Sequence, residues 1–351
     1  MSKVRPLNID RKDAEKKMEY FKIGGEVKIH PRRNFFIFST KKKSTFNILL
    51  KHMIYAAKLQ RPEHRVLANF KEGDLCFLYV MEERALYGVF EAIGRVFEGP
   101  TDIELGGDWP HMIPFRLWGS HVGVIRGGKM AELMTFISKE ISTISDVSEL
   151  HRRYLNTLLY DEGTKLLKFF IKKCLWKRPV DISLDFARNP IIKPPLDARS
   201  LMTGKPKEYV VELYLLQNLN KLEELIGGGL TEVYNQLYGY QNRYLDILAL
   251  HKQDNELLKA TVIEIKTSSS PQNLKKGLYE LAHYMYWVTD KITHDPDITF
   301  GLLLTPQPEK NAEALPNEAK MILEPFGIKL ERVLWVSYKI ERNELLFTPI
   351  S

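Results

Sequence analysis

Three residues in the last third of the chain have side-chain types and a spacing that suit phosphodiester chemistry. Asp246 lies in an apolar segment, and Glu264 and Lys266 follow in the segment Thr-Val-Ile-Glu-Ile-Lys. In a strand, side chains i and i+2 share a face, so Glu264 and Lys266 are expected to point the same way. If the two segments pair through the polar turn at 252–259, Asp246 joins them. Two carboxylates that hold a hard cation beside a lysine form an arrangement that cleaves phosphodiesters.

Such an arrangement predicts Mg²⁺, or Mn²⁺, as the cofactor. Mg²⁺ prefers oxygen ligands and keeps several waters, one of which can be the nucleophile. Asp246 and Glu264 would hold the cation. Lys266 would orient or deprotonate the attacking water, or offset charge in the transition state. A further acid can come from the preceding helix, where Glu208 and Glu212 lie one turn apart on a shared face.

A surface ion pair is the alternative interpretation of Glu264 and Lys266, because Glu-x-Lys pairs are common at strand edges. The apolar residues before them favour a functional site instead, since they indicate a strand that is buried on both faces. Charged side chains cost free energy in such a strand unless they are paired or bind a metal ion.

An α/β pattern positions these residues in the last part of the chain. A helix is expected at 208–226, where apolar residues recur at helical spacing until the glycines at 227–229. The order of the elements predicts a mixed sheet flanked by helices. The further expected strands are 244–250, 260–266, 298–305 and 331–340, and the further helices are 274–288 and 316–326.

The first half of the chain has a different pattern, with short strands and a few helices that predict an α+β, barrel-like domain. Pro114 favours an edge position for its strand. The expected strands are 34–39, 73–80, 86–97 and 112–117, and the expected helices are 12–21, 44–57, 130–141 and 149–176.

A proline-rich joint at 188–196 indicates a boundary within 178–207, because neither a helix nor a central strand continues through it. We therefore expect a first domain at 1–145, a helical segment and linker at 146–207, and a second domain, which contains the candidate nuclease residues, at 208–351.

The 351 residues carry a net charge of +7, which is spread unevenly. Residues 1–200 contain 35 Lys and Arg against 24 Asp and Glu, whereas residues 201–351 contain 16 against 20. A basic half suggests a nucleic-acid partner. A solvated basic surface without a partner is the alternative.

The sequence also predicts a cytoplasmic protein without a membrane span. No run of 18 apolar residues occurs, and the N-terminus lacks the apolar segment of a secretion signal. Cys76 and Cys174 lie in apolar segments without metal-ligand spacing, which indicates buried thiols in a reducing compartment.

The stretch from Glu208 to Ile340 resembles the PD-(D/E)XK nuclease superfamily, and within it the RecB-like domain of archaeal and actinobacterial mismatch endonucleases. The resemblance rests on the segments at 208–224, 245–249, 262–266 and 281–288. It implies that Glu208, Asp246 and Glu264 are metal ligands and that Lys266 is the catalytic lysine.

Two positions depart from the nuclease pattern. Glu280 stands where the family has a glutamine, and Tyr244 stands where it has an arginine, with Arg243 one place earlier.

Residues 35–140 resemble the YTH/EVE branch of the PUA-like fold, on the segments 35–40, 52–57, 70–80, 87–94 and 108–117. Members of that branch read modified, typically methylated, bases in an aromatic cage. Aromatic faces grip a flipped base by stacking, and a methyl group fills an apolar corner.

The resemblance implies cage walls at Tyr55, which stands where YTH domains have a tryptophan, and at Trp109 and Trp118, with Ser39 and Thr40 bonding the base edge. Tyr55 also fits a core position. Trp109 lies in a Gly-Gly-Asp-Trp-Pro loop, where a core position is harder to build and a binding role is favoured.

Together these patterns predict a modification-dependent DNA endonuclease of the restriction or defence type. Its partner would be double-stranded DNA with a modified base, and it could form a homodimer because one such site cuts one strand. The first alternative is a mismatch- or structure-specific repair endonuclease. The second is a nucleic-acid-binding protein with a non-catalytic nuclease fold.

Overall fold

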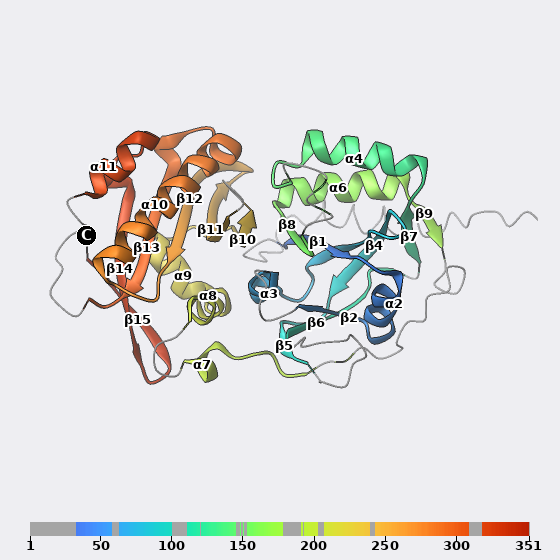
Figure 1. Ribbon diagram of the computed structural model, residues 1–351, viewed down its shortest axis with the longest axis horizontal. Helices are drawn as coiled ribbons and strands as arrows, with labels where there is room; N and C mark the ends of the chain where they lie inside the picture. Colours follow the sequence, from blue (N-terminus) through green and yellow to red (C-terminus); the bar gives the residue numbers. More distant parts are fainter. Residues whose placement is uncertain are drawn as a thin grey trace, which may run out of the picture. The chain divides into compact units, whose positions relative to one another are not determined.

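Two compact units make up the chain, one from Arg33 to Leu196 and one from Asp197 to Ser351 (Figure 1). The division falls within the expected boundary range of 178–207. The expected helix at 12–21 lies outside the described residues. The computed structural model describes residues 33–57, 63–99, 111–119, 121–144, 148, 150, 153–177, 191, 193–202, 207–238, 243–308 and 318–350.

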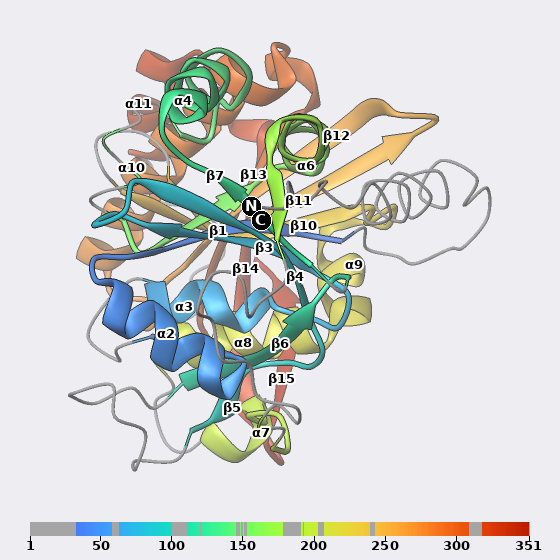
Figure 2. The same ribbon diagram turned by 90° about the vertical axis from the view of Figure 1, so that its right-hand side faces the viewer.

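A curled mixed sheet forms the first unit (Figure 2). Its main path runs in the order β2-β6-β4-β3-β1-β8, with β1 parallel to β3 and antiparallel to β8. With its helices the unit has an α+β fold. The strands are β1 (Phe35–Thr40), β2 (Ile54–Ala57), β3 (Leu75–Val80), β4 (Ala85–Ala92), β5 (Phe97–Glu98), β6 (His111–Leu117), β7 (Val122–Ile125), β8 (Leu155–Leu158) and β9 (Leu175–Lys177).

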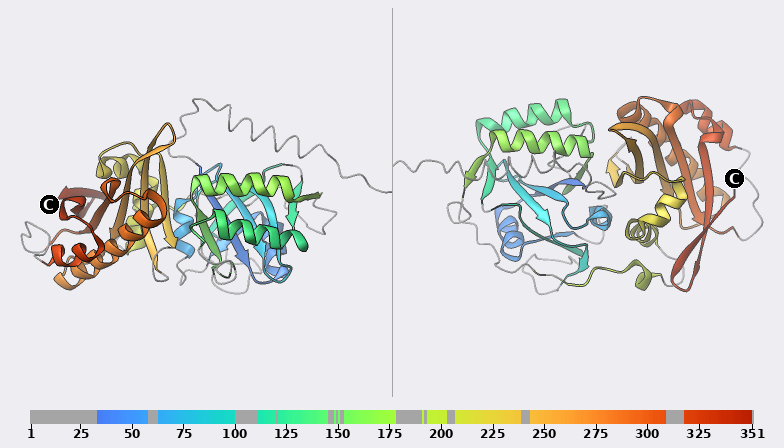
Figure 3. Two further views of the ribbon diagram at one scale, coloured as in Figure 1. Left: turned by 90° about the horizontal axis from the view of Figure 1, so that it is seen from above. Right: turned by 180° about the vertical axis from the view of Figure 1, so that it is seen from behind.

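Both faces of β1 are buried, which explains its run of apolar residues. Phe35 and Ile37 belong to a core shared with α4 (Gly128–Glu140) and α6 (Tyr160–Lys173), two helices that lie side by side over the sheet (Figure 3). Phe36 and Phe38 stack on other aromatic rings. The short helices α2 (Lys43–His52) and α3 (Glu63–Val66) complete the unit.

Four expectations for this unit are wrong. The helix expected at 44–57 ends at His52, and β2 follows it after Met53, whose φ is 51°. The segment expected to form one helix at 149–176 instead contains β8, α6 and the start of β9. Because β8 pairs with β1, part of the expected linker at 146–207 belongs to the sheet. Pro114 is not at an edge: β6 pairs with β2 up to Pro114 and with β4 beyond it, so the proline lies where the strand changes partner.

The second unit is a six-stranded mixed sheet in the order β10-β11-β12-β13-β14-β15. Strands β12, β13 and β14 are parallel, and the other neighbours are antiparallel. Helix α10 packs on β12 and β13. The strands are β10 (Glu232–Tyr238), β11 (Tyr244–Gln253), β12 (Glu256–Ile265), β13 (Thr299–Pro306), β14 (Val333–Glu341) and β15 (Glu344–Pro349), and the α-helices are α7 (Ala198–Leu201), α8 (Glu208–Gln217), α9 (Leu219–Ile226), α10 (Pro271–Val288) and α11 (Ala319–Leu323).

The expected α/β order of this unit is found, with differences at three places. The helix expected at 208–226 is divided into α8 and α9 by Asn218, whose φ of −120° and ψ of 67° are not helical. Helix α9 ends at Gly227 in the left-handed region, as the glycines predict. Strands β10 and β15 were not expected. Within the described ranges, no helix combines the length and apolarity that a membrane span requires.

Candidate functional site

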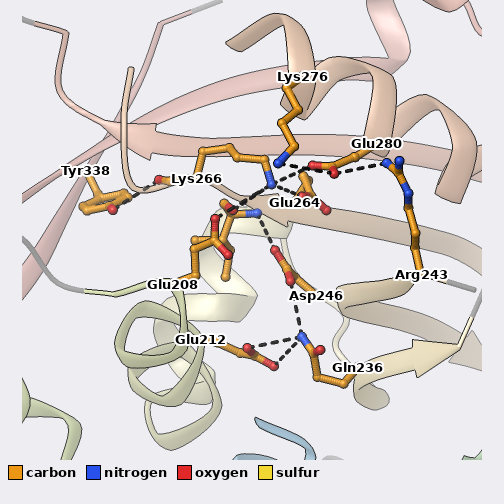
Figure 4. A network of polar contacts seen from close by, with 11 residues as sticks. Glu208, Glu212, Gln236, Arg243, Asp246, Glu264, Lys266, Lys276, Glu280 and Tyr338 are labelled. Carbon is orange, nitrogen blue, oxygen red and sulfur yellow. Dashed lines mark hydrogen bonds and ion pairs between the residues drawn. The ribbon is translucent and has the colours of Figure 1, made fainter. Parts of the chain in front are cut away.

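Asp246, Glu264 and Lys266 come together in the second unit (Figure 4). Asp246 lies on β11, Glu264 lies on β12 and Lys266 directly follows β12. The two strands pair antiparallel, as the sequence predicts. Their exposed fractions are 4%, 3% and 7%. Charged side chains this deeply buried need partners, so the arrangement is not that of a solvated surface pair.

The Lys266 ammonium group is surrounded by carboxylates. It forms ion pairs with Glu264, with Glu280 Oε2 at 2.9 Å and with Glu208 Oε1 at 3.9 Å. Burial lowers the pKa of Lys266, but the Glu264 and Asp246 carboxylates outweigh this effect and hold that pKa above its usual range. Lys266 therefore remains protonated at neutral pH, which favours charge stabilisation or water orientation over proton abstraction.

The charge of Glu264 is poorly compensated. Its Oε1 contacts Lys266, whereas its Oε2 is buried and has no hydrogen-bond partner among the described residues. Burial and the nearby Asp246 carboxylate raise the pKa of Glu264 well above its usual range, against the opposing effect of Lys266. A buried carboxylate oxygen without a donor is what a cation would satisfy.

Asp246 is held in place by two donors. Its Oδ2 accepts the Ile265 N–H at 2.9 Å, and its Oδ1 accepts Gln236 Nε2 at 3.2 Å. Gln236 lies between Asn235 and Leu237, which pair with β11, but it is itself skipped in the pairing, and its φ of 51° interrupts the regular strand there. Positive φ at a residue other than glycine is strained and often marks a functional position.

Glu212 is the second acid that Gln236 contacts. It is fully buried, and its carboxylate accepts Asn235 Nδ2 at 2.8 Å and Gln236 Nε2 at 3.3 and 3.4 Å. Glu208, one turn earlier, is partly exposed and reaches Lys266 instead. Both helix acids thus approach the site, from different directions.

The expected set of three metal ligands, Asp246, Glu264 and Glu208, is not assembled. In the part of the chain that the structure describes, no three His, Cys, Asp or Glu side chains are placed to hold one metal ion. Mg²⁺ commonly uses one or two carboxylates and keeps its waters. The unpartnered oxygen of Glu264, with Asp246 beside it, fits such a cation, and the fit rests on these two acids.

Glu280 contacts Arg243. Glu280 is one of the two departures from the nuclease pattern, and Arg243 precedes the other one, Tyr244. Arg243 donates to Glu280 Oε1 at 3.2 Å, and the other Glu280 oxygen pairs with Lys266. Burial raises the pKa of Glu280, but Lys266 more than offsets this and lowers it. Gly277 lets α10 pack closely against Lys266, because a Cβ at this position would lie 3.2 Å from Lys266 Cγ. Apart from its departure from the nuclease pattern, nothing in the sequence indicates that Glu280 belongs to the site.

In the first unit, Tyr55 packs as a core residue. It is 4% exposed, its ring stacks on Phe38 with the centroids 3.8 Å apart, and its hydroxyl donates to the Tyr154 carbonyl at 2.8 Å. Trp118 is also buried in the core, and Trp109 lies outside the described residues. The structure favours the core interpretation of Tyr55, and the aromatic cage stays a prediction.

Ser39 lies close to Tyr55, because the Tyr154 carbonyl also accepts the Ser39 N–H at 2.7 Å. Both Ser39 and Thr40 are buried. The Thr40 hydroxyl donates to the Lys42 carbonyl at 3.4 Å, whereas the Ser39 hydroxyl has no hydrogen-bond partner among the described residues. Neither side chain is therefore placed at an open surface.

Asn156 on β8 is a polar residue that the sequence analysis missed. It is 3% exposed, and neither atom of its carboxamide has a hydrogen-bond partner in the described ranges. The short segment Leu-Asn-Thr-Leu gave no signal, because it lies inside what looks like one amphipathic helix.

No family model and no curated protein matches this chain. Its structure is similar to that of the YTH domain of Zygosaccharomyces rouxii MRB1 in complex with N6-methyladenosine RNA, with a TM-score of 0.32, 15% identity, and coverage of 42% of this chain and 94% of that one. It is also similar to human THYN1 in complex with 5-methylcytosine-containing DNA, with a TM-score of 0.28, 11% identity, and coverage of 39% and 96%. A third similar structure is the Mmi1 YTH domain in complex with RNA, with a TM-score of 0.30, 14% identity, and coverage of 45% and 85%.

Proposed function

We propose that this chain is a metal-dependent endonuclease whose second unit hydrolyses phosphodiester bonds and whose first unit reads a modified base in double-stranded DNA. The observation that carries the proposal is the buried cluster of Asp246, Glu264 and Lys266 with an unpartnered carboxylate oxygen. Structural ion pairs seldom leave such an oxygen without a donor, because its burial costs free energy.

Asp246 and Glu264 would hold Mg²⁺ or Mn²⁺. When bound, such a cation polarises a phosphoryl oxygen and lowers the pKa of a coordinated water. The N–H of Ile265 and the amide of Gln236 fix the orientation of Asp246. The Lys266 ammonium group stabilises the negative charge that develops on the phosphate, and Glu280 helps to hold that ammonium in place.

The charge distribution supports a division of labour between the two parts of the chain. Residues 1–200 have the excess of Lys and Arg, which attracts the phosphate backbone, whereas the acids of residues 201–351 attract cations. A reader of a modified, typically methylated, base would then direct the cut. A restriction or defence role in the cytoplasm belongs to the same proposal.

Cleavage of matched duplexes tests the proposal. Duplexes that contain 5-methylcytosine, N6-methyladenine, a mismatch or none of these are incubated with the full chain in Mg²⁺, Mn²⁺ or EDTA. We expect metal-dependent cleavage that prefers a methylated duplex and is lost in Glu264→Ala. Glu256→Ala, an exposed acid on the same strand, is the matched control.

Preference for the mismatched duplex with indifference to methylation would favour the repair endonuclease instead. Unchanged cleavage by Glu264→Ala would overturn the assignment of the catalytic site.

A further inference from the structure

A cleft of about 810 Å³ lies in the second unit, between the C-terminal end of α9 and the N-terminal ends of β13 and β14. Most of the side chains that line it are apolar, and two cationic side chains, Lys259 and Arg332, lie among them. Sites for small molecules commonly have this size and combine apolar walls with a few polar groups.

Strand periodicity separates this cleft from the candidate catalytic site. Lys259 and Thr261 line the cleft and are two residues apart on β12, so their side chains share a face of the sheet. Glu264 is three residues beyond Thr261 and therefore points to the other face. A molecule in the cleft would contact the side of the sheet that the proposed cleavage chemistry does not use.

Lys259 brings a positive charge that no acid balances. Its ammonium group donates to the Ile226 carbonyl at 2.5 Å and lies 4.9 Å from the centre of the Phe300 ring. Burial lowers the pKa of Lys259, and among the described residues no carboxylate opposes this effect. The carbonyl uses one of three ammonium protons, so the group can still donate to an anion in the cleft.

Thr261 adds an unused hydrogen-bonding group on the same wall. Its side chain is 4% exposed, and its hydroxyl has no hydrogen-bond partner among the described residues. A buried polar atom without a partner costs free energy and needs an explanation. Because Lys259 is its neighbour on this face, one anionic group bound there would satisfy both side chains.

Arg332 lies on the other side of the cleft and supplies a planar group. Its guanidinium carbon is 4.8 Å from the centre of the same Phe300 ring. Asp297 accepts hydrogen bonds from Arg332 through its main-chain carbonyl and, at 3.1 Å, through its carboxylate, which balances the charge of the guanidinium. The ring of Phe300 occupies only one face of the guanidinium, and the second face can stack on another planar group.

Two acids also line the cleft, and both are at exposed positions. Glu224 is paired with Lys221 at 3.1 Å, and Glu331 directly precedes Arg332. Solvent screens exposed charges more strongly than partly buried ones. The wall formed by Lys259 and Thr261 therefore favours an anion.

We propose that this cleft binds a nucleoside monophosphate, with its phosphate group on Lys259 and Thr261 and its base on Arg332. An ammonium group and a hydroxyl are donors that phosphate oxygens accept, and guanidinium planes stack on bases. Leu330 and Leu334, which also line the cleft, would cover the rest of the base. The site does not depend on the proposed function, because it uses other residues on the other face of the sheet.

Calorimetric titration of the full chain in EDTA tests this site. The ligands are AMP, GMP, CMP and TMP, each compared with its nucleoside and with inorganic phosphate. We expect at least one of the four nucleotides to bind with a Kd below about 1 mM. Its nucleoside and inorganic phosphate should each bind at least about tenfold more weakly, because each of them leaves one wall of the cleft unused.

Variants of the phosphate wall locate the binding. Lys259→Met should weaken binding of the preferred nucleotide at least about tenfold. Thr261→Val keeps the shape of the side chain and should weaken binding about 2–10-fold without lowering the Tm, because the hydroxyl that it removes has no partner in the protein. Lys320→Met removes an exposed lysine on α11 and should leave the affinity unchanged.

Three results would overturn the proposal. The first is a folded wild type that binds none of the four nucleotides at up to about 10 mM. The second is wild-type affinity in both Lys259→Met and Thr261→Val, which would place the nucleotide elsewhere. The third is binding of inorganic phosphate or of the nucleoside as tight as that of the nucleotide, which would show that the two walls do not hold one molecule.

Discussion

At the scale of single residues, Glu264 carries much of the electrostatic cost of the candidate site. Its carboxylate is buried, one oxygen lacks a donor, and its pKa is raised by burial and by Asp246. The folded protein therefore resists ionisation of this group, and a bound cation would remove that cost.

Glu264→Gln should stabilise the metal-free protein near neutral pH by about 1–2 kcal/mol, because it removes a poorly compensated buried charge. The folded-state pKa lies above the ordinary value of 4.5. The gain is thus full above the folded-state pKa and is lost as the pH falls through 4.5, below which the carboxyl is protonated in both states. Unfolding in EDTA between pH 4.5 and pH 8 measures it, and a variant that is less stable at every pH would contradict it.

Mg²⁺ should raise the Tm of the wild type and leave that of Glu264→Gln nearly unchanged, because only the wild type has the second carboxylate. Ligand binding to the folded state stabilises by RT ln(1 + [Mg²⁺]/Kd), so the shift should grow with concentration. Glu256→Ala is again the control. Equal shifts in both proteins would place the cation elsewhere.

Lys266→Met should reduce cleavage about 10²–10³-fold, because the site loses the ammonium group that faces the developing charge. Glu264 and Glu280 also lose the ammonium group that both of them contact. Because Asp246 and Glu264 are unchanged, the variant should still bind Mg²⁺ and show a thermal shift. Cleavage is measured at saturating Mg²⁺ to separate the two effects. Retention of full activity would exclude a catalytic role for Lys266.

At the scale of elements, Gln236 links two acids from different segments at the point where β10 is interrupted. Its single amide donates to Asp246 on β11 and to Glu212 on α8. Gln236→Leu should weaken Mg²⁺ binding about 10–100-fold, as loss of residues that orient metal ligands commonly does. The Mg²⁺ concentration for half-maximal cleavage should rise more than the rate at saturation falls. Gln253→Leu, at the exposed end of β11, is the control.

Helix α6 can approach β1 only because Gly163 has no side chain. A Cβ there would lie 2.1 Å from Phe35 Cγ. Gly163→Ala should destabilise the first unit by about 1–3 kcal/mol, the usual cost of overpacking. Gly128→Ala, at the start of α4, meets nothing within 4 Å and should be neutral or slightly stabilising. Denaturant unfolding of both variants measures the difference, and equal stability would contradict the close packing.

At the scale of the whole molecule, the two proposed activities belong to different units and should be separable. Glu264→Gln should bind the preferred methylated duplex in EDTA with wild-type affinity, because the proposed metal site holds the cation and not the base. Titration of the labelled duplex measures the affinity, and a large loss of affinity would mean that the two activities are coupled.

The sequence alone determined the residues and elements whose signals are local. Asp246, Glu264 and Lys266 could be found because strand periodicity and a hairpin pairing depend on neighbouring residues, and the end of α9 followed from Gly227. Burial of the site also followed, from the apolar run around Glu264.

Only the tertiary structure decided which distant residues complete the site. The pairs Arg243–Glu280 and Gln236–Glu212 join segments far apart in the chain, and no local pattern encodes such contacts. The same reason hid β8: four residues that resemble a turn of helix become a strand because β1 supplies their hydrogen bonds. Pairing with β1 also brings Asn156 beside Ser39, since position in a sheet is set by the partner strand and not by the sequence around the residue.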